Sequence, residues 1–107
     1  MIIQEISIHE LRDKLAEPNN IVLVDVRETE ELENGVISGA IHIPMGLVPE
    51  RMDELNPDAK TVIICRTGNR SRKVTQYLMS RGFMDVSNMS EGMNGWAQEV
   101  DTTMVVY

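Results

Sequence analysis

Two short runs rich in β-branched residues constrain the fold of this chain more than any other feature. Residues 21–26 read IVLVDV and residues 61–65 read TVIIC. A nearly continuous apolar run, without alternating polar side chains, is typical of a parallel strand that is covered on both faces. We therefore expect both runs to lie inside a sheet with helices on either side.

Weaker strand and helix patterns alternate along the rest of the chain. We expect short strands at residues 2–6, 40–44 and 84–89. Helical patterns lie at residues 8–15, 30–33, 48–55 and 93–100, and between residue 70 and Gly82. We expect Ser7 and Glu10 to cap the first helix, Thr29 to cap the second, and Gly82 to end the helix that begins near residue 70. We expect Trp96 to pack the last helix on the sheet. This alternation predicts an α/β fold with a mainly parallel sheet, in one domain spanning residues 1–107.

The charge of the chain is unevenly distributed. The net charge is −7, yet residues 59–84 hold six basic residues and no acidic one. An acidic protein repels nucleic acid, and Tyr77 is the one aromatic residue near the basic loop, so nucleic-acid binding is a poor explanation. A local positive site suits a small anion, and a solvated basic helix face is the simpler alternative.

Composition also indicates the cellular compartment and which cofactors to expect. A lone cysteine, Cys65, forms no internal disulfide, which fits a reducing compartment such as the cytoplasm. The apolar runs are too short to cross a bilayer and the N-terminal residues show no secretory signal, so no membrane partner is expected. His9, His42 and Cys65 are scattered along the chain, so we expect neither a metal site nor a cofactor.

The segment CRTGNRS, residues 65–71, places that cysteine between a strand and a helix. Gly68 and Asn69 tolerate the backbone conformations of a tight loop. Such a loop at a helix N-terminus directs several N–H groups into one concavity, which favours an anion and hence a thiolate. The alternative is that Cys65 is only a small buried apolar residue at the end of a strand.

Three segments together resemble the rhodanese-like family. They are LVDVRETEELENGVISGAIHIP at residues 23–44, CRTGNRS at 65–71 and EGMNGWAQEV at 91–100. The resemblance covers nearly the whole chain. It implies a small five-stranded α/β domain with helices on both faces of the sheet, and sulfur transfer through a cysteine persulfide.

The resemblance also implies roles for individual residues. Cys65 would be the nucleophile that receives a sulfane sulfur. The substrate-binding cradle would consist of Arg66, Thr67, Gly68, Asn69, Arg70 and Ser71, with Arg66 and Arg70 also attracting an oxyanion donor. Asp25 and Arg27 would be supporting residues, an ion pair that orders the loop.

Two positions depart from the family pattern, and they leave substrate preference open. Val36 stands where histidine is frequent, and Met93 stands where glycine is common, which would narrow the rim of the site. We expect Met45, Met89 and Met93 to border its mouth. The apolar tail, residues 101–107, is expected to pack on this domain or on a second copy, so both a monomer and a homodimer stay open.

The sequence therefore predicts a thiosulfate sulfurtransferase. Its partners would be a small anionic sulfur donor and an acceptor, which is cyanide in an assay and a thiol or a protein in the cell. A binding or sulfur-relay module is the main alternative. A cysteine phosphatase or arsenate reductase is less favoured, because its loop needs arginine at the sixth position after the cysteine, where this chain has Ser71.

Overall fold

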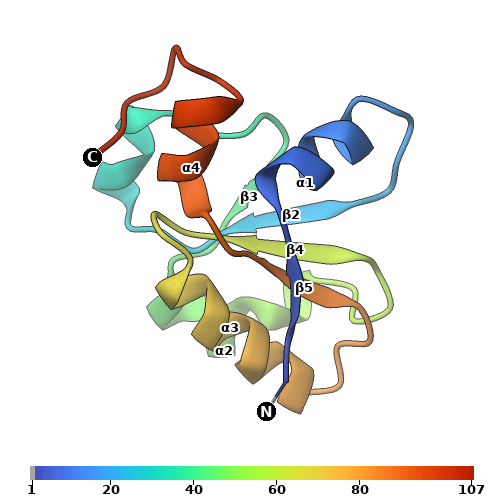
Figure 1. The fold of residues 1–107 in the computed structure, drawn as a ribbon. Helices are drawn as coiled ribbons and strands as arrows, with labels where there is room; N and C mark the ends of the chain where they lie inside the picture. The colour runs from blue at the N-terminus through green and yellow to red at the C-terminus, as the bar shows by residue number, and fades with distance from the viewer. Residues whose placement is uncertain (1) are drawn as a thin grey trace.

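The computed structural model describes residues 2–107 and has a five-stranded sheet at its centre (Figure 1). Its strands are β1 (Gln4–Ile6), β2 (Val22–Asp25), β3 (Ile41–His42), β4 (Thr61–Ile64) and β5 (Val86–Met89). They lie in the order β1-β5-β4-β2-β3, and every neighbouring pair is parallel. The two strongest predicted strands, β2 and β4, are adjacent inside the sheet, which confirms the predicted α/β fold.

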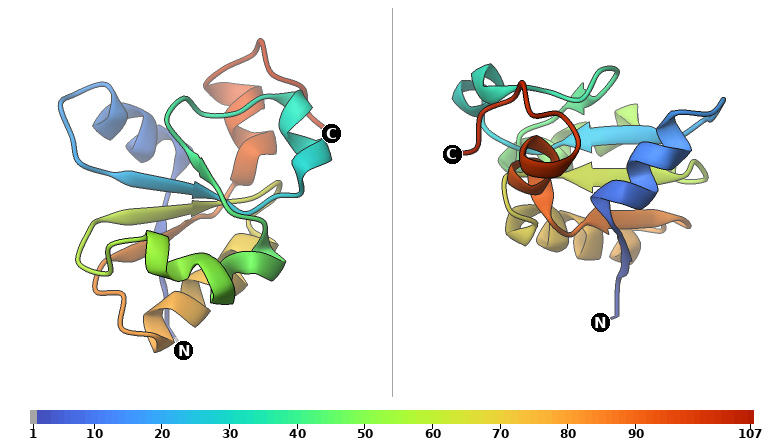
Figure 2. Two further views of the ribbon diagram at one scale, coloured as in Figure 1. Left: turned by 180° about the vertical axis from the view of Figure 1, so that it is seen from behind. Right: turned by 45° about the horizontal axis from the view of Figure 1, so that its top comes forward.

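Helices cover both faces of this sheet (Figures 1 and 2). Helices α1 (Ile8–Leu15) and α4 (Gly92–Glu99) lie on one face, and α2 (Val48–Arg51) and α3 (Asn69–Ser80) lie on the other. Three short 3₁₀ helices complete the connections: η1 (Thr29–Asn34), η2 (Met45–Leu47) and η3 (Met52–Glu54). Within residues 2–107, no helix has the length and apolar character needed to span a membrane.

The side chains of β4 divide between two apolar cores, because successive residues of a strand point to opposite faces. Val62 and Ile64 belong to the core under α1 and α4, where Trp96 is also buried as predicted. Ile63 and Cys65 belong to the core under α2 and α3. The cysteine that follows β4 therefore lies on the α3 side of the sheet.

One of the two predicted N-terminal helix caps is present. The hydroxyl of Ser7 accepts the N–H of Glu10 at 3.0 Å at the start of α1, as predicted. The cap predicted at Thr29 is wrong, because Thr29 is already the first residue of η1 and Glu28 precedes it. The Glu31 carboxylate turns back and accepts the N–H of Glu28 at 2.9 Å, so a glutamate holds this first turn.

Gly82 ends α3 as the sequence predicts. It follows the helix with a left-handed φ of 94°. The N–H of Phe83 then donates to the carbonyl of Leu78 at 3.1 Å, the pattern of a helix that ends on a glycine.

Two further left-handed glycines bring two backbone segments into contact beside the sheet. Gly68 precedes α3 with a φ of 96°, and Gly92 begins α4 with a φ of 68°. A Cβ atom on Gly68 would overlap the carbonyl of Ser90, and one on Gly92 would overlap the carbonyl of Arg66. The loop of residues 65–68 therefore packs directly on the corner between β5 and α4, which only glycine permits at both positions.

The effect of this contact is separable from the effect of the backbone angle. Gly68→Ala and Gly82→Ala place a side chain at nearly the same φ, but nothing lies within 4 Å of the added Cβ at Gly82. We expect Gly82→Ala to lower the free energy of unfolding by about 1 kcal/mol, and Gly68→Ala to lower it by at least about 2 kcal/mol. Denaturant unfolding of both variants checks this, and equal losses would contradict the role of the contact.

Candidate active site

The residues predicted for the site meet at the carboxyl ends of two neighbouring strands. Asp25 is the last residue of β2, and Cys65 directly follows β4. Because β2 and β4 are parallel and paired, their carboxyl ends lie side by side. In open α/β sheets ligands bind beyond these ends, so the structure places the predicted residues where a site is expected.

The Cys65 sulfur is buried but faces hydrogen-bond donors. The residue is 1% exposed and belongs to the same apolar core as Val26, Ile63 and Val74. Its Sγ accepts the N–H of Gly68 at 3.1 Å and the N–H of Ser71 at 3.4 Å. A cysteine that only filled the core would not need these donors, and backbone N–H groups favour a negatively charged sulfur.

The first residues of α4 set the direction of the loop's peptide groups. The N–H of Met93 donates to the carbonyl of Cys65 at 2.8 Å, and the N–H of Asn94 donates to the carbonyl of Arg66 at 3.0 Å. Both peptides are trans, so the N–H groups of Arg66 and Thr67 point the opposite way, away from α4. The loop's carbonyls are thus satisfied on one side and its N–H groups are free for the other.

Four N–H groups of the loop have no partner among residues 2–107. They belong to Arg66, Thr67, Asn69 and Arg70. The last two are in the first turn of α3, where N–H groups have no carbonyl within their own helix. Together with the N–H groups of Gly68 and Ser71 on the sulfur, they make six donors in residues 66–71. That these donors form a cradle for an anion is still a prediction.

Arg70 is already engaged by a carboxylate. Its guanidinium donates to both oxygens of Glu31, at 2.6 and 2.8 Å. Glu31 also accepts the N–H of Glu28 and, at 2.7 Å, the hydroxyl of Tyr107. The role predicted for Arg70 in gripping a donor is still a prediction, but its charge is compensated in this structure.

The same contacts shift the acid–base properties of the pair. Hydrogen bonds from Arg70 lower the pKa of Glu31 to about 2, against the effect of burial. The Glu31 carboxylate in turn raises the pKa of Arg70 above its ordinary value. Both groups are therefore charged at neutral pH, and the pair is close to electrically neutral as a unit.

Asp25 and Arg27 form the ion pair predicted for them. Arg27 is fully buried, and its Nη2 donates to Asp25 Oδ2 at 2.8 Å. Burial alone would lower the pKa of Arg27, but its hydrogen bonds to Asp25 and Tyr107 outweigh that effect and raise it. The pair reaches the loop indirectly, because Arg27 binds the Tyr107 hydroxyl at 3.1 Å and that hydroxyl binds Glu31.

The sequence did not indicate that Tyr107 belongs to the site. The tail packs on its own domain: the N–H of Val105 donates to Asn34, and the N–H of Tyr107 donates to the side chain of Asn94. The ring of Tyr107 then lies 4.9 Å from the Arg66 guanidinium. Burial raises the pKa of Tyr107, so its hydroxyl stays a donor to Glu31 at neutral pH.

The predictions that Met89 and Met93 border the mouth of the site are wrong. Met89 and Met93 are 0% and 3% exposed, and both fill the core under α1 and α4. Met93 contributes to the site through its backbone N–H rather than through its side chain. Met45 is half-buried against the opposite core, while Val36 is exposed.

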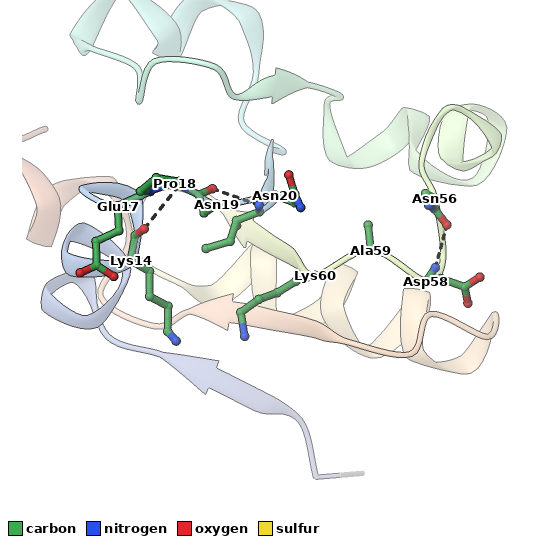
Figure 3. Close-up of a pocket in the computed structure, with 10 residues that line it drawn as sticks. Lys14, Glu17, Pro18, Asn19, Asn20, Asn56, Asp58, Ala59 and Lys60 are labelled. Atoms are coloured by element: carbon green, nitrogen blue, oxygen red, sulfur yellow. Dashed lines mark hydrogen bonds between the residues drawn. The ribbon is translucent and has the colours of Figure 1, made fainter.

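An open hollow of about 610 Å³ lies at the other end of the sheet (Figure 3). It is lined by residues 18–21, which precede β2, and by residues 56 and 58–60, which precede β4. Lysines and acidic residues are mixed around it. Because it adjoins the amino ends of the strands, it is separate from the loop of Cys65.

The low pKa of Glu31 predicts how stability depends on pH. A carboxyl whose pKa falls from 4.5 when unfolded to about 2 when folded stabilises the fold above the unfolded value, and the contribution disappears as pH falls through the folded value. We expect Glu31→Gln to lower the free energy of unfolding by about 2–3 kcal/mol near neutral pH, and by little near pH 2. Denaturant unfolding across this range measures the difference.

Tyr107→Phe is the matched control for that variant. It removes the hydrogen bond from the hydroxyl to Glu31 and the one from Arg27 to the hydroxyl, and it leaves the bidentate contact between Glu31 and Arg70. A smaller loss of stability, about 1 kcal/mol, is expected. A loss from Glu31→Gln that did not change between neutral and acidic pH would contradict the assignment.

Known proteins share both the sequence and the fold. A family model described as Rhodanese-like domain matches residues 7–99. The chain is 44% identical over 99 residues to YtwF of Bacillus subtilis, covering 92% of this chain and 95% of that protein. It is 38% identical over 97 residues to a sulfurtransferase of Allochromatium vinosum, covering 91% of each.

A solved structure agrees with these matches. The rhodanese-like domain protein of Staphylococcus aureus superposes with a TM-score of 0.85 at 34% identity, covering 98% of this chain and 99% of that one. The fold, the position of Cys65 and these relatives lead to one conclusion: the chain belongs to the rhodanese-like family.

Proposed function

We propose that this protein is a sulfurtransferase that carries a sulfane sulfur as a persulfide on Cys65. The observation that carries the proposal is the contact of Sγ with the N–H groups of Gly68 and Ser71, beside four further N–H groups without partners in residues 2–107. These donors fit an anionic sulfur, and the relatives include a protein named a sulfurtransferase.

The first step loads the enzyme. The Cys65 thiolate attacks the outer sulfur of thiosulfate, a bond forms between the two sulfur atoms, and the sulfur–sulfur bond of thiosulfate breaks. Its electron pair leaves with sulfite. The negative charge of the persulfide is then on the outer sulfur, which the free N–H groups of the loop stabilise.

The second step returns the enzyme to its starting state. An acceptor attacks the outer sulfur, the new bond forms, and the electron pair of the sulfur–sulfur bond returns to Cys65 as thiolate. Cyanide would leave as thiocyanate, and a thiol or a protein acceptor would leave as a persulfide. No second cysteine exists in the chain, so the acceptor comes from outside.

Arg66 is the cation best placed to attract an anionic donor. Its guanidinium has no carboxylate partner among residues 2–107 and lies over the ring of Tyr107, whereas Arg70 is compensated by Glu31. The same pairing disfavours a phosphatase, whose arginine must bind the substrate oxyanion. We therefore assign donor attraction mainly to Arg66 and the loop amides.

A relay module that receives its sulfur only from a partner protein is the second candidate. The observation in its favour is the 1% exposure of Cys65, which limits approach to the sulfur. Either function would use the same lone thiol, in a reducing compartment such as the cytoplasm.

Mass spectrometry after thiosulfate treatment tests the proposal. We expect Cys65 to gain the mass of one sulfur atom and to lose it when cyanide is added. Cys65→Ser provides the control, because it should gain nothing. A persulfide that forms only in the presence of a protein donor would favour the relay, and no persulfide under either condition would contradict both candidates.

The role of Arg66 predicts a split between kinetic constants. Arg66→Ala should raise the KM for thiosulfate about tenfold with little change in kcat, since one charged contact with the donor is lost. Arg72→Ala is the control, because Arg72 pairs with Glu5 at 2.9 Å on the exposed surface. Equal effects of the two variants would show that only overall charge matters.

A further inference from the structure

Asn88 is a buried polar residue on an apolar face of the sheet. It lies in β5, is 2% exposed and pairs in register with Ile63 of β4. Ile63 and Val86 on this face belong to the core under α3. A buried amide destabilises a core unless its polar atoms are hydrogen-bonded, so the partners of Asn88 indicate why the amide is there.

Both partners of Asn88 belong to the segment that surrounds Cys65. Its Nδ2 donates to the carbonyl of Gly68 at 3.2 Å. Its Oδ1 accepts the hydroxyl of Ser71 at 2.5 Å. The first contact fixes the orientation of the amide, so the oxygen is the atom that faces Ser71.

The Ser71 hydroxyl lies between two acceptors for its single proton. Ser71 is fully buried, and its Oγ is 3.2 Å from the Cys65 sulfur and 2.5 Å from Asn88 Oδ1. The amide oxygen only accepts, so the proton of the shorter bond must come from Ser71. Oγ then presents lone pairs to the sulfur, which suits a protonated thiol.

We propose that Asn88 is a positioning residue that competes with the Cys65 sulfur for the hydroxyl proton of Ser71. In the thiol form, the S–H donates to Ser71 and Ser71 donates to Asn88. In the thiolate form, the hydroxyl turns to the sulfur, and the buried Asn88 oxygen loses its donor. Asn88 therefore makes the thiolate less stable.

The competition has a consequence for sulfur transfer, and this part rests on the proposed function. In a persulfide the charge is on the outer sulfur, so Sγ no longer needs the hydroxyl. The Ser71 hydroxyl turns back and donates to Asn88 Oδ1, and the buried amide is satisfied again. Asn88 thus favours the loaded enzyme over the thiolate, and it keeps the thiolate reactive because a sulfur with fewer stabilising contacts is the better nucleophile.

None of the charged groups near Cys65 is hydrogen-bonded to the Asn88 side chain, whose partners are Ser71 and Gly68. These charged groups are Arg66 on the loop, Arg70 on α3, which acts electrostatically on Cys65, Glu31 on η1, paired to Arg70, and the Asp25–Arg27 pair at the end of β2. From β5, the side chain that reaches Ser71 is the neutral Asn88. An Asn88 variant therefore changes two contacts directly, those with the Ser71 hydroxyl and with the Gly68 carbonyl.

Asn88→Leu keeps the size of the side chain and removes both polar atoms. The measurement is the ultraviolet absorbance of the thiolate against pH, with Cys65→Ser subtracted as the blank. We expect the midpoint to move about one pH unit lower, because Ser71 is then free to donate to the sulfur. A purely structural role would leave the midpoint unchanged or move it higher, since loss of the contact with Gly68 loosens the loop.

Ser71→Ala separates the two roles of Asn88. This variant removes the hydroxyl proton for which the Cys65 sulfur and Asn88 compete, so the midpoint of thiolate formation should rise. Adding Asn88→Leu to Ser71→Ala should then produce no downward shift of that midpoint. The contact between Asn88 and Gly68 is lost equally in both backgrounds and is thereby controlled. A shift of the same size and direction in both backgrounds would overturn the proposal.

The unaltered protein provides a second measurement, which holds even where a variant does not fold. The side-chain amide resonances of Asn88 should change over the same pH range in which the thiolate appears, and constant resonances would overturn the competition. Neither measurement needs a sulfur donor. A protein that shows the competition but forms no persulfide would contradict the proposed function alone.

Discussion

The site depends on the orientation of two peptide groups, Cys65–Arg66 and Arg66–Thr67. Their carbonyls are bound by the first N–H groups of α4, which leaves their own N–H groups directed away from that helix. This contact requires close packing of two backbones, and Gly68 and Gly92 are the residues that permit it. Helix α4, on one face of the sheet, thus sets the orientation of the peptide groups in the loop that leads into α3 on the other face.

Four charged side chains at the site compensate one another's charge. Asp25, Arg27, Glu31 and Arg70 are connected through the Tyr107 hydroxyl, and their formal charges sum to zero. Breaking such a partly buried set leaves an uncompensated charge, so its members hold one another in place. These four residues connect η1 to the start of α3, and the contacts made directly with the sulfur are those of the N–H groups of Gly68 and Ser71.

Local patterns were sufficient to predict the strands, the loop and the position of Cys65 between a strand and a helix, because each is encoded in a few consecutive residues. The apolar runs predicted β2 and β4, and the glycine in CRTGNRS predicted the turn before α3. The partners of the loop were not predictable, since Glu31 is 39 residues from Arg70 and Tyr107 is 76 residues from Glu31. Asn88 did leave a signal, an amide within a buried strand, but its partners come from the fold.

The burial of Cys65 reconciles the two interpretations of that residue. Cys65 belongs to the water-excluding apolar core that also contains Val26, Ile63 and Val74, while the N–H groups of Gly68 and Ser71 donate to its sulfur. Hydrogen bonds are stronger where water is excluded, so the apolar contacts strengthen the effect of the N–H groups. The same position therefore fills the core and holds a sulfur that accepts hydrogen bonds.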